Sequence, residues 1–228
     1  MSAPAVAAKP LATLLKQLKQ RPAPPPYAQP DALHVLVMAF LQWEATRRQA
    51  ELALGRIHEA MVDLNELRVS QPDEVAALLG PAYPRAAERA ARMLEALQEV
   101  YVREHAVTLE PLAAKNKKDQ KAYLETLPGI TPYVASLVLT VGLGHACVPV
   151  DGRALAVLAD KGVCDAAADP MAVAHGIERA IKPADALDTH LRLQAAADER
   201  KAGSAAPAKP AKPAGKKAKI VAKSKKKK

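Results

Sequence analysis

The stretch LPGITPYVASLVLTVGLGHACVPVDGRALAVL, residues 127–158, decides the fold expected for this chain. It begins with a short break at 128–132, continues as an apolar helix and turns at the Gly-rich segment 142–144. Residues 148–152, VPVDG, then lead into another helix. Two helices joined by a tight hairpin present backbone N–H groups to a phosphate. Asp151, at the mouth of the next helix, is a candidate catalytic carboxylate.

Helical spacing of apolar residues recurs along the rest of the chain, and no segment sustains the alternation of a strand. The Pro-rich segment 21–26 predicts an extended connector between the first two helices. Asp119 is a candidate cap for the helix before the hairpin. The chain is therefore predicted to be all-α, with helices at about 10–20, 31–44, 47–61, 72–79, 85–104, 119–127, 132–141, 152–160, 170–181 and 184–200.

Composition narrows the class of protein. Aromatic residues make up only 3% of the chain, which favours closely packed helices over a β-sandwich. The two cysteines, Cys147 and Cys164, do not make a disulfide framework, so a reducing compartment is expected. Lys16 and Lys19 interrupt the first apolar positions, and no apolar run reaches membrane-spanning length. These features predict a soluble, cytoplasmic, nucleoid-associated protein.

Charge is distributed unevenly. Residues 201–228 hold eleven Lys and no acid, whereas residues 31–200 hold 18 basic residues and all 24 acids, a formal charge of −6. The Lys-, Ala- and Pro-rich tail at 203–228 resembles that of a linker histone and is predicted to be disordered. It is either a solubilising polycation or, as we favour, a tether that holds the body near DNA. The tail lysines expected to bind DNA are Lys216, Lys217, Lys219, Lys225, Lys226, Lys227 and Lys228.

The central stretch resembles the helix-hairpin-helix (HhH-GPD) DNA glycosylases of the endonuclease III superfamily. That family carries a hairpin of the form L-P-G-hydrophobic-G and, about twenty residues later, a V-D-T/G element; here they are 127–131 and 150–152. The resemblance, weaker over 11–200, implies a two-lobed all-α fold and DNA contacts from Gly129, Ile130, Thr131 and Pro132. Thr131 replaces a Gly that permits positive φ in the family, which puts the phosphate clamp in question.

Two positions carry the chemistry that the resemblance implies. Asp151 matches the essential Asp, which stabilises an oxocarbenium-like transition state or orients water; its alternative role is that of a helix N-cap. Tyr133 stands where bifunctional members have the Lys that forms a Schiff base, and a phenol forms no imine. A monofunctional enzyme is therefore expected. Tyr133 either lines a base pocket or belongs to the core.

The chain departs from the family at two further places. No cysteines stand where many relatives bind an iron–sulfur cluster, and the His and Cys residues lack metal-ligand spacing, so neither a cluster nor a metal is expected. Glu44 replaces the family's Gln that fills the gap left by a flipped base, and Gln42, nearby, is a possible substitute. Trp43, between them, is expected in the core. Arg153, after Asp151, is a further candidate DNA contact.

These observations predict four segments: an N-terminal helix and linker (1–30), a six-helix-bundle lobe (31–139), a second helical lobe that includes the N-terminal helix (140–202) and the tail (203–228). The leading function is a monomeric, cofactor-free, monofunctional DNA N-glycosylase of base excision repair that binds duplex DNA. The alternative is a catalytically inactive DNA-binding protein that keeps the fold. A third class is a protein-interaction module whose tail binds RNA or acidic proteins.

Overall fold

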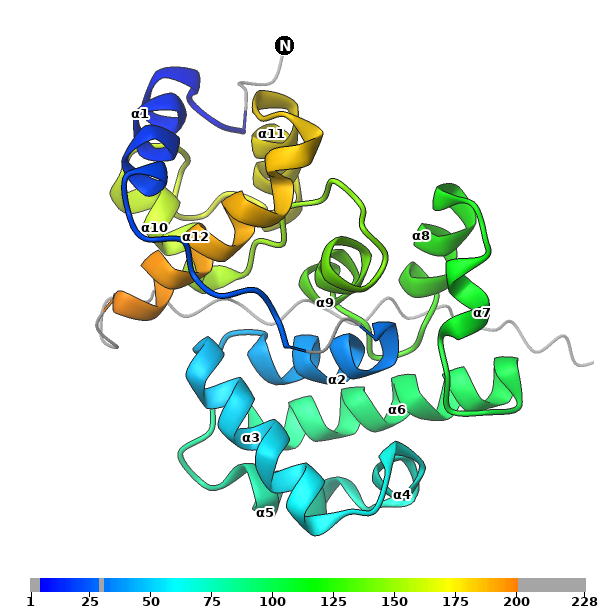
Figure 1. The fold of residues 1–228 in the computed structure, drawn as a ribbon. Helices are drawn as coiled ribbons and strands as arrows, with labels where there is room; N and C mark the ends of the chain where they lie inside the picture. The colour runs from blue at the N-terminus through cyan, green and yellow to red at the C-terminus, as the bar shows by residue number, and fades with distance from the viewer. Residues whose placement is uncertain (1–4, 29–30, 201–228) are drawn as a thin grey trace, which may run out of the picture.

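The computed structural model describes residues 5–28 and 31–200, and within these ranges the chain forms helices and no strand. The prediction of an all-α fold is confirmed. The elements in chain order (Figure 1) are α1 (Ala8–Lys19), α2 (Ala32–Gln42), α3 (Arg47–Ala60), α4 (Leu64–Val69), α5 (Pro72–Leu79), α6 (Ala86–Glu104), α7 (Glu110–Ala113), α8 (Lys117–Glu125), α9 (Pro132–Leu137), the π-helix η1 (Val138–Gly142), α10 (Gly152–Asp160), α11 (Pro170–Ala180), the 3-10 helix η2 (Pro183–Asp185) and α12 (Ala186–Glu199).

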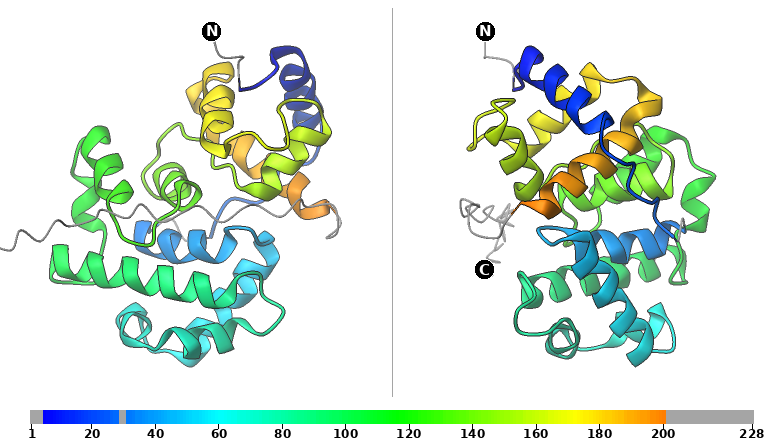
Figure 2. Two further views of the ribbon diagram at one scale, coloured as in Figure 1. Left: turned by 180° about the vertical axis from the view of Figure 1, so that it is seen from behind. Right: turned by 60° about the vertical axis from the view of Figure 1, so that its left-hand side comes forward.

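Buried apolar side chains form two separate clusters, which define two lobes. The first lobe runs from α2 to η1, and its core includes Phe40, Leu97 and Leu137. The second lobe combines α1 with α10, α11 and α12 around Leu158 and Ile177. Both views in Figure 2 show α1 packed against the C-terminal helices, although these helices follow it by more than 100 residues in the sequence. The described connector at 21–28 is not helical. It leads from α1 in the second lobe back toward α2 in the first.

Polar side chains fix where the helices begin. Asp31, Thr46 and Asp169 each accept a backbone N–H in the first turn of α2, α3 and α11, as N-cap residues do. Thr46 also forms a reciprocal capping box with Gln49. The prediction that Asp119 caps the helix before the hairpin is wrong. Asn116 accepts the N–H of Asp119 at 3.0 Å and starts α8 one turn earlier.

A buried arginine closes the other end of α2. The guanidinium of Arg89, from α6, donates to the backbone carbonyls of Phe40, Leu41 and Trp43. These carbonyls lie at the C-terminus of α2, where a positive charge is favourable. Burial lowers the pKa of Arg89 to about 10, so the group is still charged at neutral pH. Arg89 therefore fixes the turn between α2 and α3, which carries Trp43 and Glu44.

Candidate functional site

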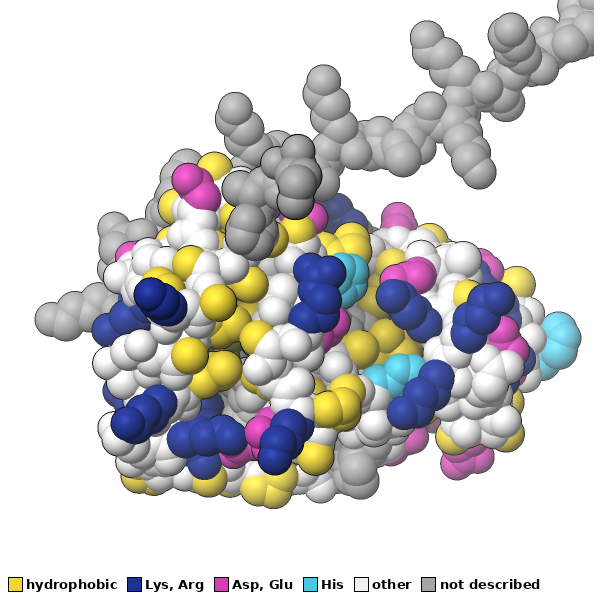
Figure 3. All heavy atoms as spheres, turned by 90° about the horizontal axis from the view of Figure 1, so that it is seen from above, with side chains coloured by type: hydrophobic (Ala, Val, Ile, Leu, Met, Phe, Trp, Pro, Cys, Tyr) yellow, Lys and Arg dark blue, Asp and Glu magenta, His cyan; other side chains and the backbone are white. Residues whose placement is uncertain are grey.

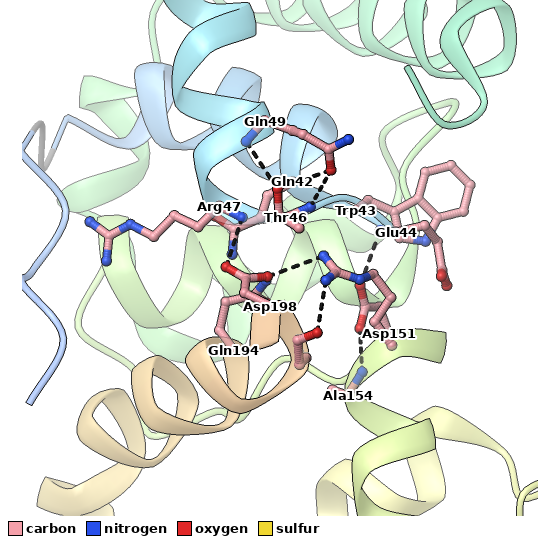
Figure 4. A network of polar contacts seen from close by, with 12 residues as sticks. Gln42, Trp43, Glu44, Thr46, Arg47, Gln49, Asp151, Ala154, Gln194 and Asp198 are labelled. Carbon is pink, nitrogen blue, oxygen red and sulfur yellow. Dashed lines mark hydrogen bonds and ion pairs between the residues drawn. The ribbon is translucent and has the colours of Figure 1, made fainter. Parts of the chain in front are cut away.

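Asp151 stands at the junction of the two lobes. It ends an extended, buried segment at 148–150 and is the N-cap of α10. Its Oδ1 accepts the backbone N–H of Ala154 at 2.8 Å, and its Oδ2 accepts the backbone N–H of Glu44 at 3.0 Å (Figure 4). The residue is 3% exposed. The carboxylate is thus a helix cap in the second lobe and a contact to the first.

Glu44 makes a second contact between the same two segments, through its side chain. Its backbone is in the left-handed region, with φ of 58°, and its Oε1 accepts the N–H of Gly152 at 2.8 Å. A Cβ on Gly152 would lie 2.8 Å from the same oxygen, so a larger residue there would displace the Glu44 carboxylate from this position. We name these two hydrogen bonds the Asp151–Glu44 clasp. Asp151 accepts the backbone N–H of Glu44, and Glu44 accepts the backbone N–H of Gly152, the residue after Asp151.

The clasp brings the buried carboxylate of Asp151 close to the partly buried carboxylate of Glu44. Burial, followed by the charge of Glu44, raises the pKa of Asp151 to about 6. The N–H groups of Ala154 and Glu44 and the charge of Arg153 act in the opposite direction. A carboxylate held at a raised pKa by burial and a like charge is a common feature of catalytic sites, although structural networks produce it too.

Tyr133 lies behind Asp151 in the interior. The amide of Gln42 donates to its hydroxyl at 3.1 Å, and the hydroxyl donates to Gln194 at 3.5 Å. Burial, followed by the charges of Tyr27 and Asp151, raises the pKa of the phenol well above its usual value. Tyr133 is therefore a neutral phenol whose hydroxyl is held between two side-chain amides.

The hairpin joins α8 to α9 through 126–131. Gly129 has φ of 72°, and a Cβ there would lie 2.5 Å from the carbonyl oxygen of Arg92, so the backbone of the hairpin packs directly on α6. Thr131 has φ of −111°, an extended conformation open to any residue, and it caps α9 by accepting the N–H of Val134 at 3.3 Å. The Thr therefore fits this hairpin without strain. Ile130 is half-buried and Pro132 is exposed.

Solved structures share the overall fold of this chain. A trapped endonuclease III–DNA covalent intermediate, an estranged-adenine complex, aligns with a TM-score of 0.63 and 16% identity over 82% of each chain. The H. pylori 3-methyladenine DNA glycosylase MagIII bound to 1,N6-ethenoadenine aligns with a TM-score of 0.61 and 15% identity, over 86% of this chain and 97% of that one. A thermostable thymine-DNA glycosylase gives 0.59 and 13%, over 86% and 89%. The chain has the fold of the helix-hairpin-helix DNA glycosylases. No family model and no curated protein matches its sequence.

Within this glycosylase fold, the residues predicted for the site take different positions. Asp151, Glu44 and Tyr133 come together at the junction of the lobes. Gln42, expected at the DNA surface, is 0% exposed because its amide bonds to Tyr27 and Tyr133. Arg153 donates to the carbonyl of Ala197 at 2.8 Å and pairs with Asp198 at 3.1 Å. The tail lysines lie outside the described residues.

A polar network extends from Tyr133 across the lobe junction, and sequence reasoning missed most of it. The hydroxyl of Tyr27, from the connector after α1, donates to Gln42 and lies 3.1 Å from Nε2 of His190. Burial lowers the pKa of His190 to about 4, so this ring is neutral at pH 7. These residues are spread over the connector, α2, α9 and α12, so no local motif in the sequence links them.

The space beside the hairpin is distinct from the clasp. A cavity of about 350 Å³ lies between α8, α9 and α11. Ile130, Ala135, Leu139 and Met171 give it an apolar lining, and Lys121 stands at its edge. Figure 3 shows the molecule from above, with hydrophobic side chains at the floor of its hollows and Lys, Arg and His around them. Neither Asp151 nor Tyr133 lines this cavity.

The described residues contain no group of three His, Cys, Asp or Glu side chains placed to hold a metal ion. In the same part of the chain, no helix is both long enough and apolar enough to span a membrane.

Sequence reasoning also missed the arginines around Trp43. Arg89 and Arg92, three residues apart, lie on one face of α6, and Arg85 is the residue directly before this helix. The turn carrying Trp43 meets this face. Trp43, expected in the core, is only partly buried and packs at its edge.

Proposed function

We propose that this protein is a monofunctional DNA N-glycosylase of base excision repair, with Asp151 as its essential carboxylate. The observation that carries the proposal is the position of Asp151. A buried acid of raised pKa caps α10 at the lobe junction, beside a neutral Tyr133 and within a fold shared with DNA glycosylases.

The proposed chemistry requires an ionised acid beside the sugar. As the bond between base and sugar breaks, positive charge develops on the sugar ring, and an adjacent carboxylate stabilises it. With a pKa of about 6, Asp151 is mostly ionised at pH 7. Tyr133 supplies no amine, so water adds to the sugar carbon that carried the base, and its proton goes to the released base. The strand stays intact.

Substrate entry requires a local rearrangement. Both oxygens of Asp151 already accept backbone N–H groups, and the Glu44 side chain lies over the start of α10. We propose that binding of a flipped nucleotide displaces Glu44 and opens the clasp. The Oδ1 bond to Ala154 keeps Asp151 oriented while its other oxygen faces the sugar.

The test is base release from a panel of duplexes that carry uracil, thymine opposite guanine, alkylated purines, adenine opposite oxidised guanine or oxidised pyrimidines. Strand breaks are scored with and without alkali. We expect release that needs alkali to reveal a break. Asp151→Asn should abolish release and leave DNA binding nearly intact. Breaks without alkali would contradict the monofunctional assignment, and release by Asp151→Asn equal to wild type would remove Asp151 from the mechanism.

The closed clasp also favours a second candidate, a DNA-binding protein that keeps the fold without the chemistry. In that case Asp151 and Glu44 only hold the two lobes together. The two candidates differ in the panel assay: the second predicts binding to DNA with no release from any duplex. It also predicts that Asp151→Asn changes stability alone.

A further inference from the structure

Trp43 occupies an unusual place for the only tryptophan of the chain. It lies in the turn between α2 and α3, directly before Glu44, and it is partly buried. Figure 4 shows its ring pointing away from the network around Asp151 and Asp198. The indole therefore lies next to the clasp without forming part of it.

Three guanidiniums from the start of α6 surround the indole. Arg85 lies 4.6 Å from the centre of the ring, Arg92 5.6 Å and Arg89 5.9 Å. Arg89 is fully engaged with carbonyls at the end of α2. Arg85 and Arg92 have side chains 31% and 33% exposed, and both pair with one carboxylate, Glu88, at 2.9 and 3.0 Å. Two accessible guanidiniums thus share a single acid beside a tryptophan.

Trp43 and the arginines around it lie between the hairpin and the clasp. Arg92 donates to the carbonyl of Gly129 at 3.3 Å, and Glu44 forms the clasp with Asp151. Three non-glycine residues of the described chain have positive φ, and two of them, Glu44 and Arg85, adjoin Trp43. Backbone strain of this kind persists where the surroundings impose it and clusters at functional sites. The local structure thus holds the indole at the edge of the lobe junction, next to the hairpin.

We propose that Trp43, Arg85 and Arg92 form a binding site for one unpaired nucleotide of DNA. Aromatic rings beside arginines bind unstacked bases by stacking and cation–π contact, and guanidiniums pair with phosphate. A base inside an intact duplex is already stacked on both faces, so the site favours a base that has lost its partner. The unpaired base would stack on the indole or on the outer face of Arg85, and its phosphate would take the place of Glu88 at Arg92.

This site shares a DNA partner with the proposed function but needs no base release. The two proposals therefore fail separately: selective binding without release retains this site alone, and release without selective binding retains the glycosylase alone.

The test uses the full chain and two duplexes of one length, one fully paired and one with a stable abasic analogue opposite adenine. Trp43 is the only tryptophan, so its fluorescence reports stacking directly. We expect strong quenching by the duplex with the unpaired adenine and little by the paired duplex. By anisotropy of labelled DNA, Trp43→Leu should weaken binding to the first duplex by about 5- to 100-fold and to the second by less than about 2-fold.

A matched control stands at the other end of α6, where Arg68 covers the ring of Tyr101 at 4.1 Å. Tyr101→Leu should leave both affinities within about 2-fold of wild type. Trp43→Tyr keeps an aromatic face and should retain most of the selectivity, and Arg85→Gln should reduce it. These two variants keep the test decisive if thermal melting shows that Trp43→Leu is misfolded. Equal quenching by the two duplexes, unchanged selectivity in the Trp43 and Arg85 variants, or stronger quenching by single-stranded RNA would overturn the proposal.

Discussion

Asp151→Asn should remove the loss of stability that the wild-type protein shows between pH 4 and pH 8. The folded protein raises the pKa of Asp151 from 3.8 to about 6. Between these values the folded state holds a proton that the unfolded chain has released, so the stability of the wild-type protein falls as pH rises from 4 to 6. Asparagine carries no charge and does not titrate, so the variant escapes this loss; it accepts only one of the two backbone N–H groups, and that cost is the same at every pH.

The size of the effect follows from the shift. Two pKa units correspond to about 3 kcal/mol, and the side chain is 3% exposed, so solvent screening removes little of it. Between pH 4 and pH 8, we expect the stability of Asp151→Asn relative to wild type to rise by about 2–3 kcal/mol, equivalent to roughly 5–10 °C in Tm for a body of this size. Urea unfolding at pH 4 and pH 8, followed by circular dichroism, measures both differences.

Asp169→Asn is the matched control, since Asp169 caps α11 with its carboxylate at 3.2–3.3 Å from backbone N–H groups and is exposed. Asparagine caps helices about as well as aspartate, so this variant should differ from wild type by less than about 0.5 kcal/mol at both pH values. If Asp151→Asn instead lowers stability equally at pH 4 and pH 8, the carboxylate is an ordinary cap and the like-charge argument fails.

Three further changes test other parts of the structure. Arg89→Gln should lower the free energy of unfolding by about 3 kcal/mol or more, since it leaves buried carbonyls at the end of α2 unpaired; a loss below about 1 kcal/mol in urea unfolding contradicts this role. Gly129→Ala should destabilise more than Gly144→Ala, because both glycines have positive φ but only at Gly129 would the new Cβ meet backbone, 2.5 Å from the carbonyl oxygen of Arg92; equal losses would mean that the hairpin can shift away from α6. Deletion of residues 201–228 should flatten the salt dependence of DNA binding, and an unchanged slope would move the electrostatic surface into the body.

The helices were predictable from the sequence because each long helix repeats its apolar positions over several turns. Leu33, Leu36 and Phe40 mark α2, for example, and all are buried. The helices α4 and α7 have six and four residues, too few to display a helical period. The start of α8 was misplaced because Asn116 and Asp119 are both good caps, and only the three-dimensional structure shows which one accepts the N–H group.

The site was predictable only where residues lie close together in the chain. The segment 127–152 contains the hairpin, Tyr133 and Asp151, and the resemblance to a family gave their relative places. Glu44 lies 107 residues from Asp151, so the bond between them left no local signal. Gln42 was expected at the surface, but Tyr133 lies on the inner side of α2 and binds its amide. The pairing of Trp43 with Arg85 depends on packing in the same way.

The two hydrogen bonds of the clasp give the separation of Glu44 from Asp151 an energetic cost. Opening it removes two N–H bonds to charged oxygens, each worth about 1.5–3 kcal/mol, and the separation of two like charges returns part of that energy. A net difference of about 3–4 kcal/mol leaves roughly one molecule in several hundred open without a ligand. If the proposed function holds, a nucleotide is admitted only when its contacts in the open site exceed this difference. Discrimination between normal and damaged nucleotides would then begin with Glu44, before the carboxylate of Asp151 meets any sugar.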